Sequence, residues 1–373
     1  MRIGMICYAS FGGSGIVATE LGAELAARGH EVHFITTDVP VRMNRFRENL
    51  FFHRVEVDTY PLFTHASYSL NLAAKILDVL RNHGLDVIHS HYAVPHAVSA
   101  YLAKEMCPGC PVRTVTTLHG TDITLVGLRP SFYEITRFSI AKSDAVTAVS
   151  DWLRQKTYQN FPDVGEIDVV RNFVDANRFK PLPAGHRDRP WAREGEFVLM
   201  HASNFRPVKN IPTIIDVFQR LRARYPVRLL MVGDGPEVPA AEERTRSLGL
   251  EDAVHFLGAQ EYLEDLLPLA DVFLLPSQHE SFGLAALEAM SCGVAVVATS
   301  EGGTREVIRN GENGFVHDPH DVDGMAASIG ALLDDPKRLE AMGGAARKTA
   351  AEEFPVGAAV ERYLAVYEHA LSR

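Results

Sequence analysis

The chain alternates short apolar runs with helix-like stretches along almost its whole length, and this alternation restricts the folds that the chain can adopt. The apolar run Val87–His91 is followed by the helix-like His96–Met106 and then by the apolar Thr114–Leu118. Such alternation predicts parallel strands whose two faces are covered by the intervening helices. Sheets of this kind bind their ligands at the carboxyl ends of the strands.

The alternation of strand-like and helix-like stretches is interrupted once and then resumes. The segment Arg178–Glu196 contains three prolines and few periodic apolar positions, and a second series of strands starts at Phe197–His201. We therefore expect an α/β protein with two Rossmann-like, doubly wound domains that face one cleft. Their predicted bounds are 1–177 and 197–355, with 178–196 as the linker and a final helix, 356–373, that packs back on the first domain.

Length and charge narrow the possible partners. The 373 residues suffice for two domains, and the formal net charge of -10 argues against a nucleic-acid partner. No apolar run approaches the roughly 20 residues that span a bilayer. The start of the chain, Met1–Ala9, is typical of a buried strand rather than a signal peptide. We therefore expect a cytoplasmic protein without a membrane span.

Cys107 and Cys110 form a CxxC sequence behind the helix-like stretch His96–Met106. In redox proteins such a pair stands at the amino terminus of a helix, where the dipole stabilises a thiolate. No further Cys/His pair lies nearby to complete a zinc site. The context favours a structural loop over a redox or metal site.

The strongest local signal is Glu280–Glu288, which follows an apolar strand and opens a helix. The backbone N–H groups of Gly283 and Leu284 would face an anion at the amino terminus of this helix. Glu280 in the entry loop can reach hydroxyls of a bound sugar, and Glu288, about two turns later, can accept from a ribose diol. The alternative is an ordinary capped helix with two solvated acids.

A second signal is Ser203–Asn210, directly after the first strand of the second series. It holds two cations, Arg206 and Lys209, at the carboxyl end of a strand. Cations in this position can neutralise a diphosphate leaving group. The alternative is a pair of solvated loop charges.

Two loops and one strand of the first half carry polar candidates. Gly12–Gly15 follows the first strand and fits a ligand-facing loop, with a dinucleotide site or a plain tight turn as alternatives. His119 follows Thr114–Leu118, where it can be a general base, a hydrogen-bonding partner of a sugar or a packed side chain. His89 and His91 share one strand face, but the sequence shows no third ligand for a metal.

Together these residues resemble the family-4 retaining glycosyltransferases, which have the GT-B fold. The residues that carry the resemblance are Glu280 and Glu288 with Ser281–Leu284 between them, Lys209, Gly12–Gly15 and Gly233–Pro236. Within the family, the chain is similar to the members that attach N-acetylglucosamine to L-malate in bacillithiol biosynthesis. This finer similarity rests on Cys7–Gly15, His91–His96, Thr116–Thr124 and Ser203–Arg206.

The resemblance implies UDP-GlcNAc as donor, UDP as product and L-malate as acceptor, with no cofactor and no metal. It implies catalytic roles for His119, Arg206, Lys209 and Glu280; donor contacts from Gly12, Gly13, Asn204, Arg206, Lys209, Glu280, Ser281, Phe282, Gly283, Leu284 and Glu288; and acceptor contacts from Ser14, Tyr92, Thr117 and Arg137. One departure is Asn204, where the family often has an arginine five residues before the phosphate-binding lysine.

Several alternatives stay open at this point. The acceptor can be an inositol phosphate, a lipid or a sugar, and the chain can be a nucleotide-sugar epimerase or a non-catalytic sugar-nucleotide sensor. Arg137 can also be a surface arginine paired with Glu134, three residues away on a helix. Whether the chain forms a homo-oligomer is equally open.

Overall fold

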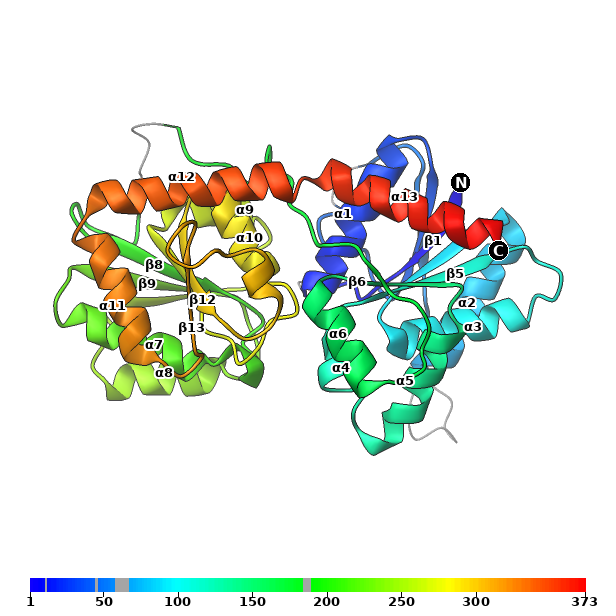
Figure 1. Ribbon diagram of the computed structural model, residues 1–373, viewed down its shortest axis with the longest axis horizontal. Coiled ribbons are helices and arrows are strands. Elements are labelled where there is room, and N and C mark those ends of the chain that lie inside the picture. Colours follow the sequence, from blue (N-terminus) through cyan, green and yellow to red (C-terminus); the bar gives the residue numbers. More distant parts are fainter. Residues whose placement is uncertain (11, 44–45, 58–66, 184–188) are drawn as a thin grey trace. The chain divides into compact units, whose positions relative to one another are not determined.

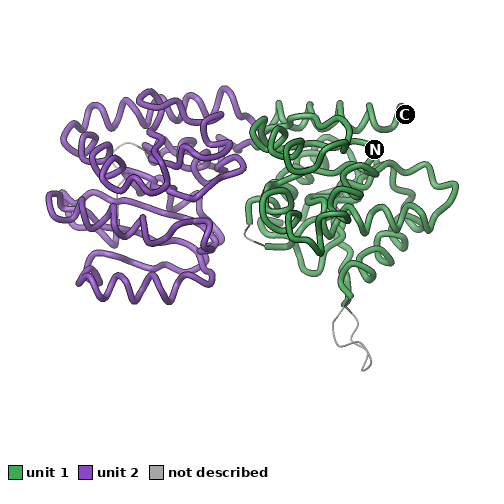
Figure 2. Tube along the Cα trace, turned by 60° about the horizontal axis from the view of Figure 1, so that its bottom comes forward, with its two compact units in different colours: residues 1–172, 357–373 green, residues 173–356 purple. Residues whose placement is uncertain are grey.

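The computed structural model describes residues 1–10, 12–43, 46–57, 67–183 and 189–373. The chain divides into two compact units, residues 1–172 with 357–373 and residues 173–356 (Figure 2). Each unit contains a parallel sheet with helices packed around it (Figure 1). The α/β fold class predicted from the sequence is therefore confirmed. The segment 178–196 belongs to the second unit, and its residues 184–188 lie outside the described residues.

The first unit has a seven-stranded sheet in the order β3-β2-β1-β4-β5-β6-β7. All its described pairings are parallel, and the strand order reverses between β1 and β4. In such sheets ligands bind where the order reverses. The strands are β1 Arg2–Ile6, β2 Glu31–Thr36, β3 Leu50–Arg54, β4 Val87–His91, β5 Arg113–Leu118, β6 Ala145–Ala148 and β7 Asp168–Val169.

Helices cover this sheet, and Ser150 caps one of them, α6. The Ser150 hydroxyl accepts a hydrogen bond from the Leu153 N–H at 3.0 Å. The final helix packs onto this unit through the buried side chains of Tyr363 and Tyr367. The helical elements are α1 Gly13–Ala27, α2 Tyr68–His83, η1 Ala93–Ala97, α3 Val98–Glu105, α4 Thr121–Thr124, α5 Pro130–Lys142, α6 Asp151–Asn160 and α13 Val356–Ser372.

The second unit has a six-stranded parallel sheet in the order β10-β9-β8-β11-β12-β13. Its strands are β8 Phe197–Ala202, β9 Val227–Val232, β10 Val254–Gly258, β11 Val272–Leu275, β12 Ala295–Thr299 and β13 Phe315–His317. Its helical elements are η2 Pro207–Lys209, α7 Ile211–Arg222, α8 Val238–Ser247, α9 Leu263–Leu266, η3 Leu267–Leu269, α10 Leu284–Ser291, η4 Gly303–Glu306, α11 Val322–Leu333 and α12 Pro336–Glu353.

The inner strands are buried along their whole length, which explains their continuous apolar runs. Every residue of β9, β11 and β12 is buried, as expected for strands that are covered on both faces. Cys107 and Cys110 lie directly after α3 and form a disulfide. Among the described residues, no helix combines the length and the apolar character that crossing a membrane requires.

Candidate active site

In the second unit, the loops after β8 and β11 are tied to one another. The Asn210 side-chain amide donates to the backbone oxygens of Pro276 and Pro319 at 3.1 and 2.7 Å. The Gln278 N–H donates to the Val208 oxygen at 2.8 Å. These bonds fix the loop that carries Lys209 against the loop that carries Glu280, both at the carboxyl ends of neighbouring strands.

The loop after β9 supports the loop after β8 from the other side. Gly233 and Gly235 have φ angles of 125° and 157°, and a Cβ on them would lie 1.8 and 2.0 Å from the carbonyl oxygens of Ser203 and Asn204. Only glycine permits this approach of two backbones. The Gly233–Pro236 sequence that contributes to the family resemblance therefore shapes the Ser203–Asn210 loop.

Lys209 and Glu280 meet at the centre of these loops. The Lys209 ammonium donates to Glu280 Oε1 at 2.6 Å, and the Ser277 hydroxyl donates to the same oxygen at 2.6 Å. The Lys209 and Glu280 side chains are only 20% and 12% exposed. The two residues are 71 positions apart in the sequence, so this pair is a product of the fold.

The electrostatics of the pair keep Glu280 ionised. Burial alone would raise the pKa of Glu280, but the charge and hydrogen bond of Lys209, together with the Ser277 hydroxyl, hold it below its ordinary value. An ionised, half-buried carboxylate can accept hydrogen bonds from sugar hydroxyls. The alternative of a solvated acid is therefore wrong for Glu280.

Gly283 shapes the loop that leads into α10. Gly283 caps the helix in the left-handed conformation, with a φ of 90°, and Leu284 is the first helical residue. Their N–H groups lie in the first turn, where a helix leaves donors without intrahelical acceptors. Ser281 is half-buried, and Phe282 is buried with its ring 5.6 Å from that of Phe354.

Glu288 lies further along α10 and is only 3% exposed, so it is no solvated surface acid either. On the loop after β8, Arg206 is exposed and Asn204 is half-buried. In the second unit, the carboxyl ends of β8 and β11 thus carry Asn204, Lys209, Glu280 and the start of α10. The donor roles expected for these residues remain predictions.

In the first unit, the loops after β1, β4 and β5 lie next to one another because these strands are neighbours. Gly12 precedes α1, Gly13 is its exposed first residue and Ser14 is buried. The Tyr92 ring lies 5.8 Å from that of Tyr8 and 5.3 Å from that of His119. The structure thus brings Tyr92 and His119 together at the predicted edge of the sheet.

Tyr92 has a strained backbone. Its φ is 103°, in a region that residues other than glycine rarely adopt, and its N–H donates to the Thr117 oxygen at 3.0 Å. Strain of this kind costs roughly 1–3 kcal/mol and concentrates at functional sites. The observation supports a functional role for the loop after β4.

His119 belongs to a group of neutral histidines. Its Nε2 lies 2.9 Å from Nδ1 of His91, and the two rings stack with their centroids 5.1 Å apart. Burial, together with the nearby His96, lowers the pKa of His119 to about 3, and burial lowers that of His96 to about 4. At neutral pH His119 therefore acts as an uncharged hydrogen-bonding group.

Asp122 organises the same loops, a role that was not predicted from the sequence. Its carboxylate accepts from the N–H groups of Ala93, His119 and Gly120 at 3.0, 3.3 and 2.9 Å. Burial raises its pKa to about 6, and these backbone donors oppose the rise. Asp122 thus joins the loop after β4 to the loop after β5. The only sequence feature that could have indicated this role is the position of Asp122, three residues after His119 in the same loop.

Two acceptor candidates have other partners in this structure. The Thr117 hydroxyl is buried and lies 2.7 Å from both His89 Nε2 and the Thr147 hydroxyl. Arg137 donates through Nε and Nη2 to Glu134 Oε2 at 3.2 and 3.1 Å, and its side chain is 44% exposed. The surface pairing weighed as an alternative for Arg137 is thus present, and the acceptor roles of both residues remain predictions.

The nitrogens of His89 are both engaged. Nδ1 lies 2.7 Å from the Tyr367 hydroxyl on α13, and Nε2 bonds to Thr117. His91 Nε2 faces the Met5 sulfur at 3.1 Å. His89 thus joins the sheet to α13, and His91 joins β4 to β1. Among the described residues, neither belongs to a group of three or more His, Cys, Asp or Glu side chains arranged to hold a metal ion.

Comparison with known proteins identifies both halves of the chain. Residues 11–178 match the family model "Glycosyltransferase Family 4", and residues 186–349 match "Glycosyl transferases group 1". A curated relative, N-acetyl-alpha-D-glucosaminyl L-malate synthase of Bacillus anthracis, is 42% identical over 98% of this chain and 96% of that protein. D-inositol 3-phosphate glycosyltransferase of Thermobispora bispora is 30% identical over 97% of this chain and 91% of that protein.

Solved structures show the same architecture. Sucrose-phosphate synthase from Thermosynechococcus elongatus aligns with a TM-score of 0.83 at 22% identity, covering 100% of this chain and 99% of that one. HepE from Anabaena, solved with UDP and glucose, aligns with a TM-score of 0.82 at 22% identity over 99% of both chains. The chain therefore belongs to the family-4 glycosyltransferases and has the GT-B fold.

Proposed function

We propose that this glycosyltransferase moves N-acetylglucosamine from UDP-GlcNAc to the hydroxyl of L-malate with retention of the anomeric configuration. The observation that carries the proposal is the 42% identity to an N-acetyl-alpha-D-glucosaminyl L-malate synthase over 98% of the chain. The UDP complexes of HepE support a uridine diphosphate donor in this fold. We place the reaction in the cytoplasm, because both proposed substrates are water-soluble metabolites.

The second unit is the proposed donor side. Lys209 and Arg206 stabilise the charge that develops on the departing diphosphate, and the N–H groups of Gly283 and Leu284 contribute from the start of α10. Glu288 accepts from the ribose hydroxyls. Glu280, held ionised by Lys209, accepts from a hydroxyl of the transferred sugar.

The first unit is the proposed acceptor side. His119, neutral because of its burial, bonds to the transferred sugar, while Ser14 and Tyr92 position the acceptor hydroxyl. Arg137 binds a malate carboxylate with two parallel hydrogen bonds, after exchanging its present partner Glu134. Thr117 would contribute through its backbone, because its carbonyl oxygen accepts the hydrogen bond from the Tyr92 N–H and so holds the loop that carries Tyr92.

The chemical step needs no protein nucleophile. The bond between the anomeric carbon and the β-phosphate oxygen breaks, and its electron pair leaves with UDP. The malate hydroxyl oxygen attacks from the same face, and its proton passes to the departing phosphate oxygen. The protein contributes orientation and electrostatic stabilisation.

The main alternative to malate as acceptor is an inositol phosphate, because the Thermobispora bispora relative is named a D-inositol 3-phosphate glycosyltransferase. The test offers UDP-GlcNAc with L-malate, D-malate or inositol 3-phosphate, and follows the products by mass spectrometry. We expect a GlcNAc–malate product from L-malate alone. Transfer to inositol 3-phosphate without transfer to malate would reject the acceptor while keeping the glycosyltransferase.

A further inference from the structure

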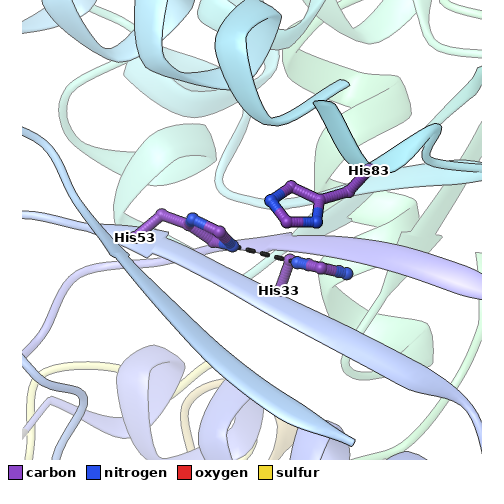
Figure 3. Close-up of side chains that lie close together, drawn as sticks. All are labelled: His33, His53 and His83. Carbon is purple, nitrogen blue, oxygen red and sulfur yellow. Dashed lines mark hydrogen bonds between the residues drawn. The ribbon is translucent and has the colours of Figure 1, made fainter. Parts of the chain in front are cut away.

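Three histidines from distant parts of the sequence converge at one edge of the first unit (Figure 3). His33 lies on β2, His53 on the neighbouring edge strand β3, and His83 is the last residue of α2. One nitrogen of each ring lies within 4.8 Å of the others. The ring centroids are 5.2 Å apart for His33 and His53, 4.7 Å for His33 and His83, and 5.1 Å for His53 and His83.

The fold fixes the positions of these three side chains. Ile35, which lies two residues after His33 and therefore on the same face of β2, pairs with His53 across the two strands. His33 and His53 are thus diagonal neighbours on one face of the sheet. Gly84, with a φ of 63°, ends α2 directly after His83. The Arg2 guanidinium donates to the His83 backbone oxygen at 2.9 Å and holds this helix end against β1.

The distances suit a metal ion after small adjustments. Nδ1 of His33 lies 2.9 Å from Nε2 of His53. In a tetrahedral zinc site the metal–nitrogen bonds of about 2.0–2.1 Å place two ligand nitrogens roughly 3.4 Å apart. The printed His33–His53 separation of 2.9 Å is shorter than this value, and one nitrogen of each of the three rings lies within 4.8 Å of the others. His83 is exposed and His53 half-buried, so both rings can turn to equalise them.

The second nitrogen of His33 gives an independent indication. His33 is 1% exposed, and its buried Nε2 has no hydrogen-bond partner among the residues that the structure describes. If Nδ1 binds a metal, the proton resides on Nε2. A Glu31 carboxylate oxygen lies 4.0 Å from that nitrogen, just beyond hydrogen-bonding distance. Metal-bound histidines usually donate their other N–H to such a carboxylate.

The protonation of the rings fits ligation. Burial lowers the pKa of His33 to about 4, with further contributions from His53, His83 and Arg2. Burial and His83 also lower the pKa of His53, with Lys75 adding to this and Asp78 opposing it. Neutral imidazole is the form that binds a metal ion.

We propose that His33, His53 and His83 form a binding site for one Zn²⁺ ion, with Glu31 orienting His33 and water in the fourth position. Three imidazoles suit zinc and neighbouring late first-row ions rather than Mg²⁺ or Ca²⁺. The site lies on β2, β3 and α2, whereas the transfer candidates of this unit follow β1, β4 and β5. The ion would therefore tie edge strand β3 to β2 and α2, and would take no part in sugar transfer.

Calorimetric titration of chelator-treated, tag-free full-length protein with ZnCl₂ tests this proposal. We expect one Zn²⁺ per chain, no comparable heat with MgCl₂, and a zinc-dependent rise of the unfolding temperature. His53→Ala and His83→Ala should each weaken binding at least tenfold. Glu31→Gln should weaken it by about tenfold, the lower end for loss of such a carboxylate. His369→Ala, which removes an exposed histidine on α13, should leave binding unchanged.

Cobalt substitution adds a readout of geometry, because a tetrahedral Co²⁺ site absorbs visible light strongly. We expect this absorption in the wild type and in His369→Ala, but not in His83→Ala. Equal zinc affinity in the wild type and in both His53→Ala and His83→Ala would overturn the proposal, as would the absence of one-to-one binding in the wild type. Neither measurement uses sugar transfer, so the result is independent of the proposed function.

Discussion

The Lys209 ammonium lies 2.6 Å from Oε1 of Glu280, and Ser277 donates to the same oxygen. Each side chain therefore offsets the charge of the other in the ligand-free protein. A bound diphosphate would share the ammonium, and a sugar hydroxyl would share the carboxylate. In the proposed donor site, one ion pair thus joins the loops after β8 and β11 before any ligand binds.

Replacing Lys209 by alanine should lower turnover by about 10²–10³-fold, corresponding to the roughly 2.7–4 kcal/mol that one electrostatic partner of a developing charge supplies. The matched control is Lys337→Ala, which removes an exposed lysine on α12 of the same unit. Steady-state kinetics with a circular-dichroism check of folding measures the effect. Near-normal turnover in Lys209→Ala would remove this residue from the mechanism.

Gly302→Ala should weaken UDP binding by about tenfold or more, the loss expected from one misplaced charge-assisted hydrogen bond. Gly302 has a φ of 108°, and its Cβ would lie 2.0 Å from the Glu280 carbonyl oxygen, so the Glu280 loop must shift. Gly311→Ala is the control, because Gly311 has a φ of 80° with open space around its Cβ. Equal UDP affinity of the two variants, measured by calorimetry, would contradict the role of the Glu280 loop.

The pH profile of kcat/KM should show no inflection from His119 between pH 5 and pH 8. Burial and His96 lower its pKa to about 3, so the ring is neutral throughout this range and gains a proton only in stronger acid. His119→Asn should reduce kcat/KM by roughly 5- to 100-fold, as for the loss of a hydrogen bond worth about 1–3 kcal/mol. An inflection between pH 6 and pH 7 that vanishes in His119→Asn would show that His119 titrates during catalysis.

Arg137→Lys should raise the KM for malate by about tenfold with little change in UDP affinity, because lysine keeps the charge but loses the two-pronged contact. Glu134→Gln weakens the present partner of Arg137 and should leave the KM for malate unchanged or lower. Kinetics at saturating donor measures both variants. Unchanged malate kinetics in Arg137→Lys and Arg137→Ala would exclude Arg137 from the acceptor site.

Much of the fold follows from local sequence patterns. The strand β4 has the predicted bounds, Val87–His91, and all five of its residues are buried. The helix α1 begins at Gly13, so Gly13–Gly15 of the predicted ligand-facing loop already belong to the helix. The edge strand β3, Leu50–Arg54, was missed because its residues are mostly exposed or half-buried and lack a clear alternation.

The sequence predicted which loops carry the site residues, but not which of these residues contact one another. The positions of His119 and Glu280 behind their strands followed from the alternation of strands and helices. The pairing of Lys209 with Glu280, and the joining of two loops by Asp122, depend on which strands are neighbours in the sheet. The histidine group on β2, β3 and α2 was missed for the same reason, together with the missed strand that carries His53.

The most direct test of the account is a proton NMR spectrum of the product formed from UDP-GlcNAc and L-malate by the full-length protein. We predict one molecule of UDP for each molecule of GlcNAc–malate, with the sugar in the α configuration that it has in the donor. A β-linked product would contradict attack from the face of the departing phosphate. Release of UDP with free sugar and no malate conjugate would contradict the proposed acceptor.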